Sequence, residues 1–319
     1  MKILIAGGAG FIGSVLIPKL LERGYNVDVI DLFWFGNHLP KEVGTINKNI
    51  FDLTEADIKG YEQVIFLAGL SNDPMAEYSP AENFISNGSA PPFLAYIAKR
   101  AGVRRFIYAG SCSVYGYTVN ELYDETSPAV SNYPYGISKL QGENAVMQMM
   151  DKDFSVIAFR QGTVSGYSPR MRLDLVVNTM FKFALMDGSI TVNNPAIWRP
   201  VLAIKDAATA YIRAIEANND LSGVFNVASG NYTVGEIGDL VQSGVKKYLN
   251  KEVKLNIKHV QDYRNYKVST EKAKKVLSFH PKNDVETIIQ DLVENYDKFK
   301  DFTNPMYYNI QVFKTLPKR

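Results

Sequence analysis

The chain opens with an apolar run that passes directly into a glycine-rich loop, and this feature constrains the fold most. Lys2 to Ala6 has the length of a buried strand and continues into GGAGFIG, in which Gly7, Gly10 and Gly13 are spaced three apart. Residues 13–23 then show the apolar spacing of a helix. This order is typical of a dinucleotide-phosphate site, because glycine lets a pyrophosphate approach the backbone and the helix N-terminus offers unpaired N–H groups.

An acidic residue follows at the expected distance. Residues 26–30 form a second apolar run, and Asp31 comes directly after it. Its carboxylate would accept hydrogen bonds from the adenosine ribose hydroxyls and would repel a 2′-phosphate. No arginine occurs in residues 32–35, so the sequence favours NAD over NADP. The alternative is a glycine-rich turn followed by an unrelated aspartate.

Strand-like and helix-like patterns alternate through the first half of the chain. Apolar runs of strand length recur at residues 63–68, 106–109 and 155–160, and helical patterns lie between them at 83–101 and 134–150. This predicts the α/β class, with a Rossmann-type doubly wound parallel sheet. We expect one domain over residues 1–165, with residues 200–230 returning to it. A smaller C-terminal α/β part would occupy residues 166–319.

Composition excludes several classes of function. The net charge of the 319 residues is +2, and 21% are charged, which gives no reason to expect nucleic acid or a membrane surface as a partner. No apolar run is long enough to span a bilayer. The only cysteine is Cys112, so no internal disulfide can form, and a reducing, cytoplasmic location is expected. The three histidines are scattered, and no metal site is predicted.

A tyrosine and a lysine, Tyr135 and Lys139, stand four residues apart after Pro134, on one face of an expected helix. A lysine ammonium beside a tyrosine, together with the positive charge of an oxidised nicotinamide, would stabilise the phenolate and make Tyr135 a base near neutral pH. This spacing alone is common on surface helices. However, Ser111 and Ser113 follow the strand at 106–109, at the sheet edge where α/β proteins build their sites.

Together, GGAGFIG, Asp31, LAG at 67–69, Asn87, SCSVYG and YGISK resemble the extended branch of the short-chain dehydrogenase/reductase superfamily. More narrowly, the chain resembles the NAD-dependent nucleotide-sugar epimerase/dehydratase family over essentially its whole length. The resemblance implies NAD as cofactor, a nucleotide-diphosphate sugar as substrate, a C-terminal part that binds mainly this sugar, and a homodimer formed through the helices at 83–101 and 134–150. It implies the catalytic residues Ser111, Tyr135 and Lys139. It implies cofactor contacts from Gly7, Gly10, Phe11, Ile12, Gly13, Asp31, Asp52, Leu53, Leu67, Ala68, Gly69, Asn87, Tyr135 and Lys139. It implies substrate contacts from Ser71, Ser111, Ser113, Asn178, Arg199 and Arg264.

Departures from the family pattern narrow the reaction. Dehydratases carry an Asp-Glu pair after the catalytic serine or threonine, and decarboxylases tend to carry a glutamate there, whereas this chain has Cys112 and Ser113. Galactose-type epimerases often have a lysine where Ser71 stands and R-Y-F-N where this chain has RQGT at 160–163. We therefore expect an epimerase that oxidises its sugar transiently. The alternatives are a 4-keto-sugar reductase and, less favoured, a dehydratase or a catalytically silent NAD-binding regulatory protein. Cys112 is expected to be a small buried turn residue rather than an acid/base or redox group.

Overall fold

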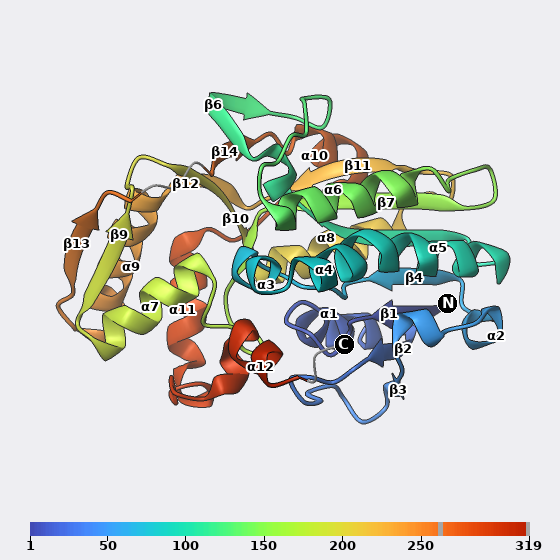
Figure 1. Cartoon of the computed structure of the whole chain (residues 1–319). Helices are drawn as coiled ribbons and strands as arrows, with labels where there is room; N and C mark the ends of the chain where they lie inside the picture. Colours follow the sequence, from blue (N-terminus) through green and yellow to red (C-terminus); the bar gives the residue numbers. More distant parts are fainter. Residues whose placement is uncertain (261–263, 317–319) are drawn as a thin grey trace.

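The computed structural model describes residues 1–260 and 264–316 and is built around a seven-stranded parallel sheet (Figure 1). Its spatial order is β11-β7-β5-β4-β1-β2-β3. The strands are β1 (Lys2–Ala6), β2 (Asn26–Asp31), β3 (Gly44–Asn47), β4 (Gln63–Phe66), β5 (Arg105–Ser111), β7 (Ser155–Gln161) and β11 (Gly223–Val227). Every neighbouring pair in this sheet is parallel, which confirms the predicted doubly wound α/β fold.

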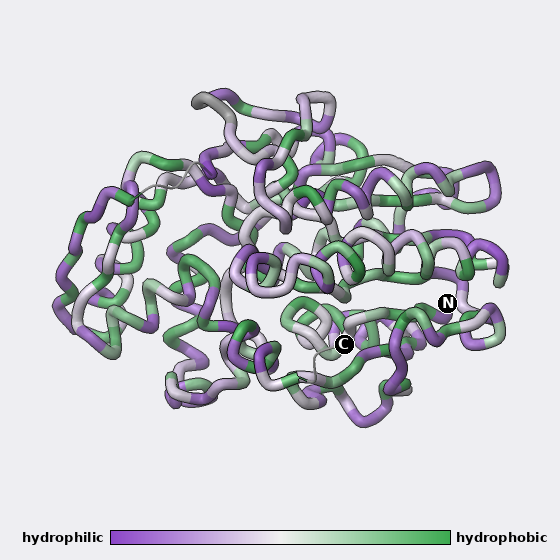
Figure 2. Tube along the Cα trace, viewed as in Figure 1, coloured by the Kyte–Doolittle hydropathy of each residue, from purple (hydrophilic) through white to green (hydrophobic). Residues whose placement is uncertain are grey.

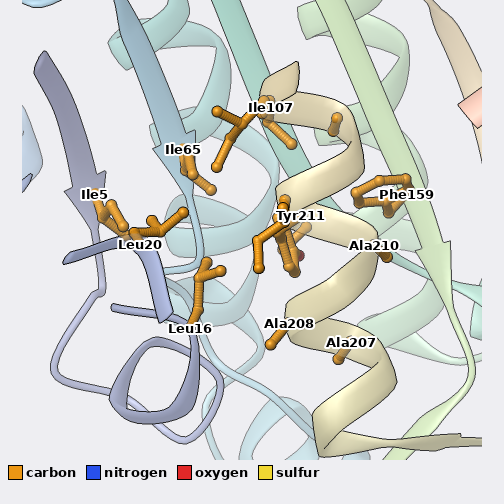
Figure 3. Packing of buried hydrophobic residues seen from close by; sticks show 14 of the residues in the cluster. Ile5, Leu16, Leu20, Ile65, Ile107, Phe159, Ala207, Ala208, Ala210 and Tyr211 are labelled. Atoms are coloured by element: carbon orange, nitrogen blue, oxygen red, sulfur yellow. The ribbon is translucent and has the colours of Figure 1, made fainter. Parts of the chain in front are cut away.

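Helices cover both faces of the sheet, which explains why its strands are continuously apolar. One face carries α1 (Gly13–Leu21), α8 (Ile204–Glu216) and α10 (Glu271–Leu277); the other carries α2 (Glu55–Ile58), α5 (Ala90–Arg100) and α6 (Pro134–Met147). Figure 3 shows α8 presenting alanines and Tyr211 towards the sheet, next to Leu16 and Leu20 of α1. Figure 2 shows hydrophobic and hydrophilic residues alternating along the helices that border the sheet. α5 and α8 are amphipathic, as a covered sheet requires, whereas α6 buries mainly small and polar residues such as Gly142 and Glu143.

The direction in which strands are added to the sheet reverses between β1 and β4, and this leaves a crevice at their carboxyl ends. Gly7, directly after β1, has a φ of 78° and lies against the residues that follow β4. A Cβ on Gly7 would be 2.5 Å from the nitrogen of Ala68. Only glycine fits here, because a side chain would force the two strand ends apart.

The helix expected at 83–101 is interrupted. It consists of α4 (Pro80–Asn83), a π-helical turn η2 (Phe84–Ser89) and α5. Pro91 and Pro92 have no N–H to donate to the carbonyls four residues earlier, so the ordinary helical bonds cannot form at this point. The widened turn buries Asn87, whose Nδ2 donates to the Leu70 carbonyl at 2.9 Å.

The C-terminal part has its own core beside the large sheet (Figure 1). It contains the sheet β12-β10-β8 (Gly230–Thr233, Trp198–Ala203, Thr163–Ser165) and the pair β13-β9 (Lys254–Lys258, Ser189–Asn193), with α7 (Val176–Met186), α9 (Val234–Leu249) and α11 (Val285–Glu294). The strand β6 (Tyr117–Tyr123) pairs with β14 (Asn265–Val268). The remaining elements are the short helix α3 (Asp73–Tyr78) and the 3-10 turns η1 (Ile50–Asp52), η3 (Cys112–Tyr115), η4 (Tyr296–Lys298) and η5 (Pro305–Tyr307). The last helix, α12 (Asn309–Thr315), returns to α3. Among the described residues, no helix combines the length and apolarity needed to cross a membrane.

A buried ion pair fastens α6 to the sheet. Arg160 of β7 donates to Glu143 of α6 through Nη2, at 2.7 Å, and through Nε, at 3.0 Å. The two side chains are 7% and 2% exposed. Arg160 also donates to the Tyr115 hydroxyl at 2.8 Å. Because Glu143 lies one turn beyond Lys139, the pair fixes how α6 presents its first turns to the end of β5.

Replacing Glu143 by alanine should leave the Arg160 charge buried without a carboxylate. We expect the free energy of unfolding to fall by about 3–5 kcal/mol, measured by chemical denaturation. Glu286→Ala is the matched control, because its partner Lys247 belongs to an exposed pair and little change is expected. Equal losses in the two variants would show that the buried pair does not hold α6.

Candidate functional site

A cavity of about 1010 Å³ lies along the carboxyl edge of the large sheet, and the C-terminal part forms its other wall. Most residues singled out in the sequence line it: Gly7, Gly10, Phe11, Ile12, Asp31, Leu67, Ala68, Gly69, Ser71, Ser111, Ser113, Tyr135, Lys139, Arg199 and Arg264. They come from the ends of β1, β2, β4 and β5, from the start of α6 and from the C-terminal part. Residues that are distant in sequence therefore share one space.

The hydroxyl, phenol and ammonium groups meet at one end of this cavity. Ser111 closes β5, and its Oγ accepts hydrogen bonds from the Ser113 backbone N–H at 3.2 Å and from the Ser113 hydroxyl at 2.9 Å. Tyr135 lies in the first turn of α6 and is hydrogen-bonded to Ser111. Lys139 lies one turn later; its Nζ is 5.9 Å from the centre of the Tyr135 ring and donates to the Ala109 carbonyl at 3.1 Å.

The protein alone does not make Tyr135 a base. Burial raises the pKa of Tyr135 to about 12, although the hydrogen bond with Ser111 acts in the opposite direction. Burial also lowers the pKa of Lys139 to about 8. Desolvation therefore outweighs the effects of the protein's own groups on the pKa of Tyr135, and the lowered pKa expected when a nicotinamide charge is also present stays a prediction.

Asp31 ties the glycine loop to the end of β2. Its two carboxylate oxygens accept the backbone N–H groups of Ala9, at 3.0 Å, and Phe33, at 2.8 Å. Burial raises the pKa of the Asp31 carboxyl, while these bonds and the charge of Arg170 lower it. The preference for NAD was inferred from the lack of an arginine in residues 32–35. The structure supplies an arginine near Asp31 from a segment more than a hundred residues away.

Five predicted contact residues do not line the cavity: Gly13, Asp52, Leu53, Asn87 and Asn178. Ile50 and Phe51, beside Asp52 and Leu53, line it instead. The buried Asn87 lies behind the wall, and a Cβ on Gly69 would be 2.2 Å from its Oδ1.

Asn178 has a different environment from the substrate contact implied by the resemblance. It is fully buried, accepts the Gly166 N–H at 2.9 Å and donates to the carbonyls of Gly166 and Arg172, at 2.9 and 2.8 Å. These bonds use both ends of its amide. Asn178 therefore positions the segment that follows β8, and direct contact with substrate stays a prediction.

Two arginines from the C-terminal part line the cavity and contact each other. Arg199 donates to the carbonyls of Trp198, at 2.9 Å, and Arg264. Arg264 forms an ion pair with Asp73, with Nη1 and Oδ2 2.7 Å apart. The structure thus brings together the two residues that the resemblance assigns to a nucleotide diphosphate.

Sequence reasoning missed part of the wall. Arg170, Arg172, Asp174 and Asn309 line the cavity, and none of them belongs to a motif that was recognised; Gln161 also lines it and was noted only as part of RQGT at 160–163. The segment SPRMRLDL at 168–175 did carry a signal, because three charged residues stand among apolar ones in a stretch without periodicity. Charged side chains in such surroundings are rarely buried without a function or a partner.

Cys112 is not placed for chemistry. It is 1% exposed, and its thiol donates to the Arg160 carbonyl at 3.2 Å. Burial raises the pKa of the thiol, so it stays protonated. In the described part of the chain, no group of three or more His, Cys, Asp or Glu side chains is arranged to hold a metal ion.

Comparison with known proteins agrees with this geometry. The profile of the NAD dependent epimerase/dehydratase family matches residues 3–228, more than half of the chain, so the protein belongs to this family, as its motifs predicted. UDP-glucuronic acid decarboxylase 3 of Arabidopsis thaliana is 29% identical over 88% of this chain and 85% of its own length. UDP-glucose 4-epimerase of Corynebacterium glutamicum is 26% identical over 91% and 94%.

Solved structures show the same fold. MoeE5, in complex with UDP-glucuronic acid and NAD, has a TM-score of 0.81 and 24% identity, covering 93% of this chain and 99% of that one. UDP-glucuronic acid 4-epimerase of Bacillus cereus, also in complex with UDP-glucuronic acid and NAD, has a TM-score of 0.80 and 22% identity over the same shares.

The lowered pKa of Lys139 predicts a pH-dependent cost in stability. The pKa of an unfolded lysine is about 10.4, and burial lowers the pKa of Lys139 in the folded protein to about 8. The unfolded chain therefore binds more protons between these two pH values. Burial of the charged ammonium lowers the free energy of unfolding by its full amount below pH 8. This loss disappears as the pH rises towards the pKa of lysine in the unfolded chain. Lys139→Met should therefore stabilise the ligand-free protein at pH 7, with the difference shrinking above pH 8.

Chemical denaturation of both proteins over a pH series measures this. Lys59→Met, at an exposed position, is the control and should show no such pH dependence. A difference between Lys139→Met and wild type that stays constant up to pH 10 would contradict a charged, buried Lys139.

Proposed function

We propose that this protein is an NAD-dependent epimerase that acts on a nucleotide-diphosphate sugar through transient oxidation to a keto-sugar. The observation that carries the proposal is that Ser111, Tyr135 and Lys139 line the same cavity as the glycine loop and Asp31. The arginines of the C-terminal part line it too, which suits a substrate with a diphosphate. The decarboxylase and epimerase relatives named above act on UDP-sugars, and this supports a nucleotide sugar as substrate.

The residues that line the cavity fit a dinucleotide. Gly7 and Gly10 leave room for phosphates beside the backbone, and α1 directs its N-terminus towards them. Asp31 offers carboxylate oxygens to a ribose. When bound, NAD accepts a hydride from a sugar carbon and later returns it.

Each catalytic side chain then has a distinct task. Tyr135, as phenolate, removes the proton of a sugar hydroxyl and gives it back when the keto group is reduced. Ser111 orients that hydroxyl through its Oγ. Lys139 supplies a positive charge on the same side of the cavity, and its neutral form is accessible near pH 8. Inversion follows if the keto-sugar turns, or exchanges a neighbouring proton, before it is reduced.

The environment of Cys112 supports epimerisation over dehydration. Elimination of water needs a further acid/base beside Ser111, and the position after it holds a buried, protonated thiol. A 4-keto-sugar reductase remains the second candidate function, because net oxidoreduction uses the same Ser111, Tyr135 and Lys139.

A homodimer, a cytoplasmic location and a division into a cofactor domain and a substrate part also belong to this proposal. The helical surface of η2, α5 and α6 carries exposed apolar side chains, among them Ile85, Tyr96 and Ile137, which supports association through these helices. Arg199 and Arg264 lie beyond residue 165, which supports a substrate-binding role for that part. The lack of any cysteine besides Cys112 fits a reducing compartment.

Replacement of Tyr135 by phenylalanine should lower turnover by roughly 10²–10⁴-fold, because the hydroxyl that moves the proton is gone. Binding of NAD should stay close to that of the wild type, since the ring still packs in the wall. Steady-state rates and NAD titration measure the two effects. A variant that retains half of the activity would show that Tyr135 does not transfer the proton.

Epimerase and reductase differ in their use of the cofactor. We expect purified protein to carry bound NAD and to convert a UDP-, GDP- or dTDP-sugar into an isomer, with no net change in the absorbance of reduced nicotinamide. Product analysis by NMR, with the Tyr135→Phe protein as the inactive control, identifies the inverted carbon. Stoichiometric NADH consumption with a product that differs by two hydrogens would instead establish the reductase.

A further inference from the structure

The cavity wall contains an aspartate that no step of the proposed function uses. Asp73 is the first residue of α3 and lines the cavity, and its side chain is 18% exposed. Its Oδ2 accepts a hydrogen bond from Arg264 Nη1 at 2.7 Å. Its Oδ1 is buried and, within residues 1–260 and 264–316, has no hydrogen-bond partner. One oxygen of this carboxylate is therefore left unsatisfied by the described residues.

Asp73 also lies near the reacting groups. The helix α3 packs against α6, which carries Tyr135 in its first turn. Besides burial and the hydrogen bond with Ser111, two charges act on the pKa of Tyr135: Asp73 raises it and Arg172 lowers it. Asp73 is thus bonded to Arg264 and is at the same time close enough to Tyr135 to act on its charge.

Neighbouring residues fix the position of this carboxylate. Asn72 donates through Nδ2 to Asp174 Oδ2 at 2.9 Å, and Ser71 accepts a hydrogen bond from Asn309 of α12 at 2.6 Å. Figure 1 shows α3 at the end of the large sheet that faces the C-terminal part. Three successive residues before and at the start of α3 are therefore bonded to three different segments of that part.

A substrate bound as proposed would extend past Asp73. Its diphosphate would meet Arg199 and Arg264. Its reacting hydroxyl would meet Ser111 and Tyr135. The sugar ring joins these two groups, and Asp73 contacts the first region and acts electrostatically on the second. The carboxylate therefore faces the sugar ring itself.

Two further charges in this region are paired with each other. Arg172 donates to Asp174 through Nε, at 2.9 Å, and through Nη2, at 3.2 Å, so this pair carries no net charge. Once a diphosphate shares the charge of Arg264, Asp73 remains as a carboxylate beside the sugar. A carboxylate accepts hydrogen bonds from hydroxyl groups and repels a second carboxylate, most strongly where water is excluded.

We propose that Asp73 determines the class of sugar: it accepts hydrogen bonds from the hydroxyl groups of a neutral pyranose and excludes a uronic acid by charge repulsion. The inference rests on the proposed function, since it assumes that a nucleotide-diphosphate sugar occupies the cavity. It also narrows that function, because the relatives named above include a UDP-glucose 4-epimerase and a UDP-glucuronic acid decarboxylase.

The test compares sugars that differ only in the group attached to carbon 5. The nucleotide is chosen first, as whichever of UDP, GDP and dTDP binds to the NAD-loaded protein. Calorimetry then compares its glucose, glucuronic acid and glucuronamide derivatives, of which the last has the shape of the acid without its charge. We expect wild-type protein to bind the glucose and glucuronamide derivatives about 10- to 100-fold more tightly than the glucuronic acid derivative.

Asp73→Asn removes the charge at nearly unchanged volume. This variant should bind the glucuronic acid derivative within about threefold of the glucose derivative. Its affinity for the nucleotide diphosphate alone should not fall, because Arg264 no longer has to leave a carboxylate. Glu77→Gln is the matched control: Glu77 is exposed on the same helix, is not among the described residues that line the cavity, and its variant should match the wild type.

Three results would overturn the inference and leave the proposed function intact. Wild-type protein could bind the glucuronic acid derivative at least as tightly as the glucose derivative. It could bind glucuronamide as weakly as glucuronic acid, which would show that shape and not charge decides. Asp73→Asn could change all three affinities equally, which would make Asp73 a structural partner of Arg264. The first two results need no variant, so the inference is tested even if Asp73→Asn does not fold.

A different result separates the two proposals. If none of the nucleotide diphosphates or their sugar derivatives binds to the wild type, the proposed function fails together with this inference. Binding without discrimination between neutral and acidic sugars overturns only the role of Asp73.

Discussion

The site depends on the close approach of two parallel strands at the point where the sheet changes direction. β1 and β4 are neighbours, and the turn after β1 contacts the residues after β4 so closely that Gly7 has no room for a side chain. Beyond β1 the sheet continues with β2 and β3, and beyond β4 it continues with β5, β7 and β11. The crevice, the glycine loop and the cavity that follows are consequences of this one contact.

The end of the cavity that holds Ser111, Tyr135 and Lys139 depends on a second contact, between α6 and the sheet. Tyr135 and Lys139 are on a helix, whereas Ser111 ends a strand, so their relative position is set by how α6 docks on the sheet. The buried pair of Glu143 and Arg160 provides that docking with two directional bonds. Burial favours the neutral form of both titratable side chains. It therefore raises the pKa of Tyr135 and lowers the pKa of Lys139.

The C-terminal part completes the cavity with cations. Arg199 and Arg264 contribute at one region of the wall and Arg170 at another, and α12 joins the second region to Ser71 and Trp34. The cavity wall therefore carries two separate cationic regions.

Local patterns in the sequence were sufficient for the parallel sheet, the glycine loop with Asp31, and the pairing of Tyr135 with Lys139, because each is set by a short stretch with its own periodicity or turn chemistry. They also indicated the family. The interruption of the helix at 83–101 was visible only in hindsight, in two adjacent prolines. Tertiary structure alone decided the rest: the nearness of Arg170 to Asp31, the pairing of Glu143 with Arg160, the direction of the Tyr135 pKa shift, and the use of Asn178 to hold a backbone segment. Each depends on contacts between residues far apart in the chain and on how deeply they are buried, and neither quantity is written in any local stretch of sequence.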